Sequence, residues 1–185
     1  MSATLTRHRF TVEEYTELIE FGVLGENQRV ELIRGEVVNK MPIGERHLFC
    51  VNQLNRLLNR QAGDDAIVSV QNPIRLDDSE PEPDIALLRP REDSYRSVKP
   101  QGRDVLLVIE VADTSLEVDR EIKRQLYAEA GIPEYWIVNL PDSCVEVFRH
   151  PWPDGTYRDM MIVGAGQKLQ VAALPSCGIE VSQLL

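Results

Sequence analysis

Three segments of the chain repeat apolar residues at the spacing of an amphipathic helix. The first predicted helix covers residues 10–21, where Thr11 and Glu14 have the spacing of a capping box. The second covers residues 47–61 and carries an apolar stripe suited to a core-facing helix. The third covers residues 116–130, between an Asp-Thr-Ser start signal and a Gly-Ile-Pro stop signal.

The chain before the third predicted helix also contains strand patterns. Residues 29–41 predict a hairpin that turns at Arg34-Gly35. Residues 104–112 are almost wholly apolar, which is typical of a strand covered on both faces. Further short strands are predicted at 66–70, 73–76 and 84–89.

In the second half, residues 134–139 and 144–150 predict two strands joined by a short turn. The turn-rich residues 151–171 predict a second hairpin, and the tail 173–185 predicts a short terminal helix. The order of these elements indicates an α/β fold in which helices flank a central sheet. We expect a single domain over residues 1–185.

The composition is that of an ordinary globular protein, with 43% hydrophobic and 27% charged residues. No apolar run approaches the roughly 20 residues that a membrane-spanning helix needs. The N-terminus lacks the apolar core of a signal peptide, so we expect a cytoplasmic protein without membrane contact. The three cysteines are far apart and odd in number, which favours buried, reduced thiols.

The formal net charge of −10 argues against a broad basic surface for nucleic acid. It does not exclude a DNA substrate, because a divalent cation bound at an acidic site lowers the local repulsion. Any affinity for DNA is therefore expected to be low.

Two acids occupy strand positions where a charge is unusual. Asp84 opens the apolar run that begins at Ile85, and Glu110 follows five apolar residues in the 104–112 strand. A buried, unpaired carboxylate is costly, whereas two carboxylates on neighbouring strands can share a hard cation such as Mg²⁺. The alternative for Asp84 is a solvated turn started by the prolines beside it.

A lysine follows these acids on the third predicted helix. Asp119, Lys123 and Tyr127 are spaced i, i+4, i+8 and therefore share one helix face. A lysine stem is long enough to bring its ammonium back over the end of the Glu110 strand. The alternative is a solvated Asp119–Lys123 pair that stabilises only the helix.

Three stretches occur in the same order in one known protein family: VELIRGEVVNKMPIGERH, EPEPDIALL and LLVIEVADTSLEVDREIKRQLYAEAGIPEYWIVN. They fall within residues 10–150, and the last joins an acid-ended strand to a D-x-x-x-K-x-x-x-Y helix and a G-x-P-E-Y-W-x-V strand. On these motifs the chain resembles the Uma2 family (DUF820) of the PD-(D/E)XK nuclease superfamily. The resemblance implies a restriction-endonuclease-like mixed sheet with additional β-hairpins. It also implies a DNA endonuclease that depends on Mg²⁺ or Mn²⁺.

Residue by residue, Pro83-Asp84 matches the PD of the superfamily motif, and Glu110 matches the acid of (D/E)XK. The position of the motif's lysine holds Ala112, which departs from the superfamily pattern. The Uma2-like pattern instead places a lysine on the next helix, which here is Lys123.

The resemblance also implies roles for these residues. Asp84 and Glu110 would hold the metal, with the Val111 carbonyl as a further ligand. Lys123 would orient or deprotonate the attacking water, or stabilise the pentacovalent phosphorus. Glu31 would reach the metal directly or through water.

Other polar residues have both a site and a structural interpretation. His47 is either a capping or buried residue or a catalytic one, and Tyr127 and Gln71 either line the cleft or only pack. Glu80 and Glu82 are expected at a solvated loop edge.

A rival hypothesis is a non-catalytic or accessory module of the same fold that binds a protein partner or DNA. The acidic charge and the lack of a separate DNA-recognition domain favour it. The Asp84, Glu110 and Lys123 set favours the enzyme. A homodimer is also possible, because one catalytic site cuts one strand and the late strands offer a sheet edge for pairing.

Overall fold

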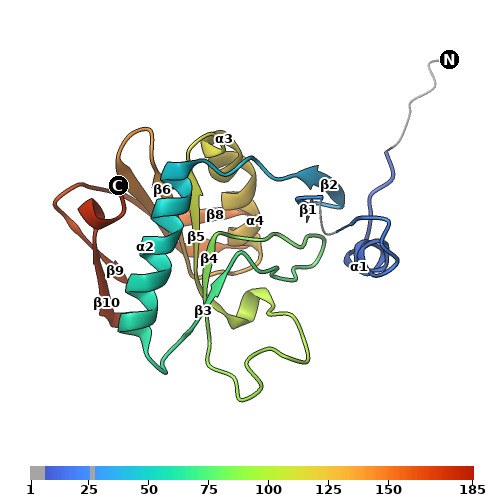
Figure 1. Cartoon of the computed structure of the whole chain (residues 1–185), viewed down its shortest axis with the longest axis horizontal. Coiled ribbons are helices and arrows are strands. Elements are labelled where there is room, and N and C mark those ends of the chain that lie inside the picture. The colour runs from blue at the N-terminus through green and yellow to red at the C-terminus, as the bar shows by residue number, and fades with distance from the viewer. Residues whose placement is uncertain (1–6, 26–27) are drawn as a thin grey trace.

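The computed structural model describes residues 7–25 and 28–185. Its centre is a six-stranded mixed sheet in the order β3-β4-β5-β6-β7-β8 (Figure 1). The sheet strands are β3 (Ile67–Val70), β4 (Ile85–Leu88), β5 (Val105–Ala112), β6 (Glu134–Asn139), β7 (Cys144–Trp152) and β8 (Thr156–Gly164). The expected α/β class with a mixed central sheet is confirmed.

The two central strands, β5 and β6, run parallel, and every other neighbouring pair in this sheet is antiparallel. A parallel pair needs a crossover connection, because a tight turn only joins antiparallel strands. The connection here is a continuous helical segment, which we call the crossover helix. It consists of α3 (Leu116–Val118), a π-helical turn (Asp119–Lys123) and α4 (Arg124–Glu129).

Helices cover both faces of the sheet (Figure 1). On one face, Ile109 and Val111 of β5 pack in a core with α2 (Glu45–Ala62) and the C-terminal hairpin of β9 (Lys168–Val171) and β10 (Leu174–Glu180). On the other face, the alternate β5 residues Val108 and Ala112 pack with the crossover helix. Burial on both faces explains why β5 reads as a continuous apolar run.

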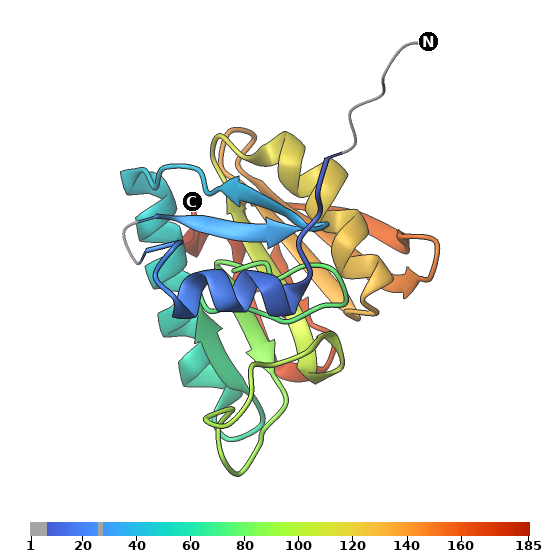
Figure 2. The same cartoon turned by 90° about the vertical axis from the view of Figure 1, so that its right-hand side faces the viewer.

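The N-terminal elements form a separate small layer. Helix α1 (Val12–Glu20) begins with the expected capping box, in which the Thr11 hydroxyl accepts from the Glu14 N–H at 3.2 Å and the Glu14 carboxylate accepts from the Thr11 N–H at 2.8 Å. It lies beside the hairpin of β1 (Val30–Ile33) and β2 (Glu36–Asn39), as Figure 2 shows. The expected turn at Arg34-Gly35 joins these two strands, and both residues have positive φ.

Two predicted elements differ in the structure. Residues 73–76 form no regular strand, because the Ile74 and Leu76 N–H groups donate to carbonyls of the nearby loop, Pro81 and Ser79, at 2.9 Å each. The tail contributes β10, and its only helical part is a single 3₁₀ turn at Val181–Gln183.

The third helix is also not α-helical throughout, because it contains the π-helical turn. Among the described residues, no helix is long and apolar enough to cross a membrane. The three cysteines are free thiols; Cys50 and Cys177 are buried, as expected, and Cys144 is only half-buried.

Candidate functional site

Asp84 lies immediately before β4 and is buried, with 8% of its surface exposed. Its Oδ2 accepts from the Val111 N–H at 2.9 Å and lies 2.9 Å from His47 Nε2. Its Oδ1 accepts from Gln71 Nε2 at 3.2 Å. Burial alone would raise the pKa of Asp84, but His47, the Val111 N–H and Gln71 together lower it below its usual value. Asp84 is therefore held as a carboxylate inside the protein.

Glu110 is the neighbouring acid on β5 and is also buried. Its Oε1 accepts from the Lys123 ammonium at 3.0 Å and from the Tyr127 hydroxyl at 2.7 Å. Its Oε2 accepts from the Asp84 N–H at 3.3 Å. The pKa of Glu110 is raised to about 8, mainly by burial. The nearby acids add to this shift, and Lys123 opposes it. Without a bound cation, Glu110 therefore carries a proton over much of the neutral range.

Lys123 enters the site from the π-helical turn and is buried. Its Nζ lies 3.0 Å from Glu110 Oε1 and 3.2 Å from Glu31 Oε1. Burial disfavours the charged ammonium, but Glu110, Glu31 and Asp119 outweigh that effect and raise the pKa of Lys123. The lysine thus remains protonated between Glu110 and Glu31.

Asp119 does not form the solvated pair with Lys123 that was considered as the alternative. Both side chains are buried, and the Ser115 hydroxyl donates to Asp119 Oδ2 at 2.6 Å. Burial raises the pKa of Asp119, and nearby acids add to that shift against the opposing effects of Lys123 and Ser115.

Glu31 comes from β1, far from the other acids in the sequence. Its Oε1 meets Lys123, and its Oε2 accepts from the Glu82 N–H at 3.1 Å. The hairpin is therefore tied to both the crossover helix and the loop before β4.

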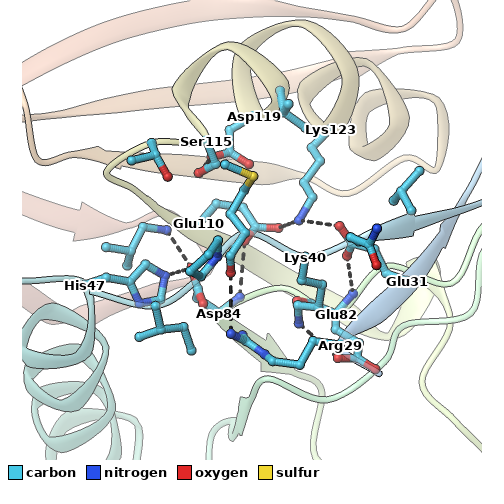
Figure 3. A pocket seen from close by; sticks show the side chains of 18 of the residues that line it. Arg29, Glu31, Lys40, His47, Glu82, Asp84, Glu110, Ser115, Asp119 and Lys123 are labelled. Atoms are coloured by element: carbon cyan, nitrogen blue, oxygen red, sulfur yellow. Dashed lines mark hydrogen bonds and ion pairs between the residues drawn. The ribbon is translucent and has the colours of Figure 1, made fainter. Parts of the chain in front are cut away.

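These side chains meet in a cavity of about 230 Å³ between the hairpin, α2 and the crossover helix. Figure 3 shows Lys123 reaching down from the crossover helix, Glu31 from the hairpin side and His47 from α2. Asp84, Glu110 and Val111 line the same cavity. The structure thus brings together the candidate site residues Glu31, Asp84, Glu110 and Lys123.

The donor set can be tested against a divalent cation. Within residues 7–25 and 28–185, no three His, Cys, Asp or Glu side chains form a ready metal-binding group. A carboxylate has about four lone-pair positions, and the described donors fill three on Asp84 and three on Glu110. One position on each remains open, at Asp84 Oδ1 and Glu110 Oε2. Two hard oxygens on residues that line one cavity fit Mg²⁺, and a cation there would replace the proton on Glu110.

Three residues for which the sequence allowed either a site role or a structural role contact these acids directly. His47 and Gln71 hydrogen-bond to Asp84, and Tyr127 hydrogen-bonds to Glu110. Each of the three lies on a different element from the acid that it contacts. Sequence spacing alone therefore could not predict these contacts.

The solvated loop edge expected for Glu80 and Glu82 is wrong for Glu80. Its N–H donates to the Leu32 carbonyl at 2.8 Å, which turns its carboxylate inward to meet Arg75 and Lys99. Glu82 is half-buried and pairs with Lys40 at 2.9 Å.

A mixed sheet with two carboxylates at adjoining ends of neighbouring strands, and a lysine supplied by the crossover helix, defines an α/β protein of the nuclease-like fold class. The chain belongs to the Uma2 family, described as "Putative restriction endonuclease", which matches residues 12–182. The fold is shared with the crystal structure of "a putative nuclease belonging to DUF820" from Anabaena variabilis. That match has a TM-score of 0.73 at 15% identity and covers 95% of this chain and 97% of the other. No curated protein matches the chain.

Proposed function

We propose that the chain, as one domain over residues 1–185, hydrolyses phosphodiester bonds in DNA as a Mg²⁺- or Mn²⁺-dependent endonuclease. One observation carries the proposal: a buried ammonium lies between buried carboxylates at the floor of a cavity, 3.0 Å from Glu110 and 3.2 Å from Glu31. Membership of the Uma2 family supports the same activity. A DNA substrate and three free thiols support a cytoplasmic location.

Asp84, Glu110 and the Val111 carbonyl would hold the cation. When bound, the cation supplies charge to the phosphate and lowers the pKa of a water molecule. His47 and Gln71 fix the direction of Asp84, and Tyr127 fixes that of Glu110.

Lys123 acts as a fixed positive charge in this mechanism. Its raised pKa keeps it protonated, with no lone pair free to accept a proton from water, so it stabilises negative charge that develops on the phosphate. Glu31 and Glu110 hold the ammonium in place between them.

The test is nicking of supercoiled plasmid DNA by the purified protein with Mg²⁺ or Mn²⁺. Asp84→Asn removes the charge at nearly constant shape and should abolish nicking, whereas Asp159→Asn, at an exposed position on β8, should leave it intact. Nicking that is equal in wild type and Asp84→Asn would contradict the proposal.

The second candidate is a non-catalytic module that binds a protein partner or DNA. It is favoured by the internal donors that already occupy most of the acceptor positions on Asp84 and Glu110, and by the net charge of −10. Calorimetry separates the two: a nuclease site binds Mn²⁺ and loses that binding in Asp84→Asn, whereas the module shows no binding in either protein.

We also propose a homodimer formed along β8, the edge strand of the central sheet. Three consecutive residues there, Met160, Met161 and Ile162, are exposed, although they lie on both faces of the strand. An edge strand with exposed apolar side chains is a ready surface for pairing with a second copy.

A further inference from the structure

Aliphatic side chains line both walls of the cavity above the acids. Met41 and Ile43 stand on the linker between β2 and α2, and Val118 and Ile122 stand one turn apart on the crossover helix. All four are more than one third exposed: 49%, 38%, 42% and 44% in that order. Exposed apolar side chains that converge on one cavity indicate a binding surface rather than a chance exposure.

Cationic groups reach the same cavity from two sides. Lys123 lies at the floor, and Arg29 and Lys40 line the hairpin side, where Figure 3 shows both beside Glu82. Lys40 pairs with Glu82, and Arg29 donates to the Met41 carbonyl at 3.4 Å. Acids line the cavity as well, so a negative group fits there together with the bound cation. A ligand for this cavity then combines that negative group with an apolar, flat or branched part next to it.

An intact DNA duplex does not present that combination. Its outer surface offers phosphates and sugars, while the bases are stacked and paired inside. A strand with an unpaired base offers both parts, because the base can turn away from its neighbours and pack against protein side chains. The net charge of −10 points the same way, since binding to a duplex depends on neutralising many phosphates.

We propose that the cleft takes single-stranded or locally unpaired DNA, with the base beside the scissile phosphate packed between the two aliphatic walls. The inference rests on the proposed nuclease function and names its substrate class. The linker residues Met41 and Ile43 form one wall, and Val118 and Ile122 form the other. The phosphate then lies over Lys123 and the two acids.

The test is a binding measurement that does not depend on cleavage. Fluorescence anisotropy compares labelled oligonucleotides of one sequence as a single strand, a full duplex and a duplex with an unpaired flap, with Ca²⁺ as the hard cation. We expect the single strand and the flap to bind at least about tenfold more tightly than the duplex. Met41→Ser and Ile122→Ser should each remove most of that preference.

Ile19→Ser is the matched control, because Ile19 on α1 is exposed to almost the same degree as Ile122 but lies outside the cavity. Equal affinity for single strand and duplex, or an unchanged preference in both Met41→Ser and Ile122→Ser, would overturn the inference. Metal-dependent nicking of duplex DNA would still support the nuclease. Conversely, a preference that the two variants remove, without cleavage in Mg²⁺ or Mn²⁺, would support the inference and contradict the nuclease.

Discussion

Lys123 is held by acids that come from two distant parts of the chain, Glu31 on β1 and Glu110 on β5. Removing one partner from a buried charged group leaves the others uncompensated, so the lysine contributes to stability as well as to the site. These two contributions can be separated with a second lysine–glutamate pair, since the partly exposed Lys99 holds the buried Glu80 at 2.5 Å outside the cavity.

We therefore predict different outcomes for two lysine variants. Lys123→Gln should lower kcat for DNA cleavage by about 10²–10³-fold, because it removes a charge that acts on the transition state. It should also lower the free energy of unfolding by about 3–5 kcal/mol. Lys99→Gln should lower stability less, because Lys99 is partly exposed and Arg75 still holds Glu80, and it should leave kcat unchanged. Urea unfolding and single-turnover cleavage measure the two effects; equal kcat in both variants would contradict the assigned role.

Glu110 also makes stability depend on pH. Its pKa is raised in the folded protein from 4.5 to about 8, so the unfolded chain loses this proton at lower pH than the folded chain. The contribution of Glu110 to the stability of the metal-free protein should therefore be greatest below about pH 4.5. It should be lost as the pH rises to about 8. Asp119, whose pKa is also raised, acts in the same direction.

The measurement is urea unfolding in EDTA at pH 5, 6.5 and 8. In Glu110→Gln, which has no proton to lose, the decline should be much shallower. The lowered pKa of Asp84 has its effect only below about 3.8, outside this window. A stability that rises steadily from pH 5 to 8 in the wild type would contradict the raised pKa of Glu110.

At the scale of elements, the β1–β2 hairpin is the part of the site that depends most on a single turn. Gly35 has φ +74, and a Cβ there would lie 2.8 Å from Arg9 Cβ and 3.0 Å from the Phe10 carbonyl oxygen. The turn thus needs glycine for its backbone conformation and for the close approach of the N-terminal segment. Because the hairpin carries Glu31, strain at this turn should reach the lysine.

Gly35→Ala should lower the free energy of unfolding by more than about 1 kcal/mol and should also lower the cleavage rate. Gly166→Ala is the matched control, because Gly166 has φ +84 with no atom within 4 Å of its added Cβ. Gly166→Ala should lower the free energy of unfolding through backbone strain but leave the cleavage rate unchanged. If both variants cleave DNA at the wild-type rate, the hairpin does not govern the position of Glu31.

Hydrophobic periodicity predicted the regular strands and helices that pack in the core. It failed where hydrogen bonds within a loop determine the backbone conformation. The β5 strand and α2 follow directly from their apolar spacing, and the Thr11 capping box from two residues. Residues 73–76 have a strand-like composition, but their N–H groups bond to their own loop. The π-helical turn has no signal in the sequence, because the side chains of residues 119–123 also suit an α-helix.

At the scale of the whole molecule, the sequence singled out the acids and the lysine that meet in the cavity, but not the residues that hold them. Glu110 stands out because a charge interrupts an apolar run, and Asp84 because a charge opens one. The contacts of His47 and Gln71 with Asp84 depend on how α2 and the loop after β3 pack against the sheet. Such contacts between distant segments follow from tertiary packing, which no local pattern encodes.

The exposed edge of the central sheet leads to a prediction for the assembled protein. If two copies pair along β8, the mass from light scattering should be twice that of one chain, and Ile162→Lys should reduce it to that of a monomer. Ile122→Lys, at an exposed isoleucine outside β8, should leave the dimer intact. A monomer at working concentration in the wild type would contradict the β8 dimer.

The crossover between the two parallel strands also sets the order in which the site forms during folding. Lys123 and Tyr127 are only 13 and 17 residues from Glu110, whereas Glu31 meets the Glu82 N–H across 51 residues. Closing the shorter loops costs less conformational entropy, so β5 and the crossover helix can form a nucleus first. The charged lysine would then be buried with one acid before the hairpin arrives. The late docking of the hairpin brings Glu31 to Lys123 and completes the neutralisation of the lysine. Mutations in β1 should therefore mainly speed unfolding, while mutations in β5 should slow folding.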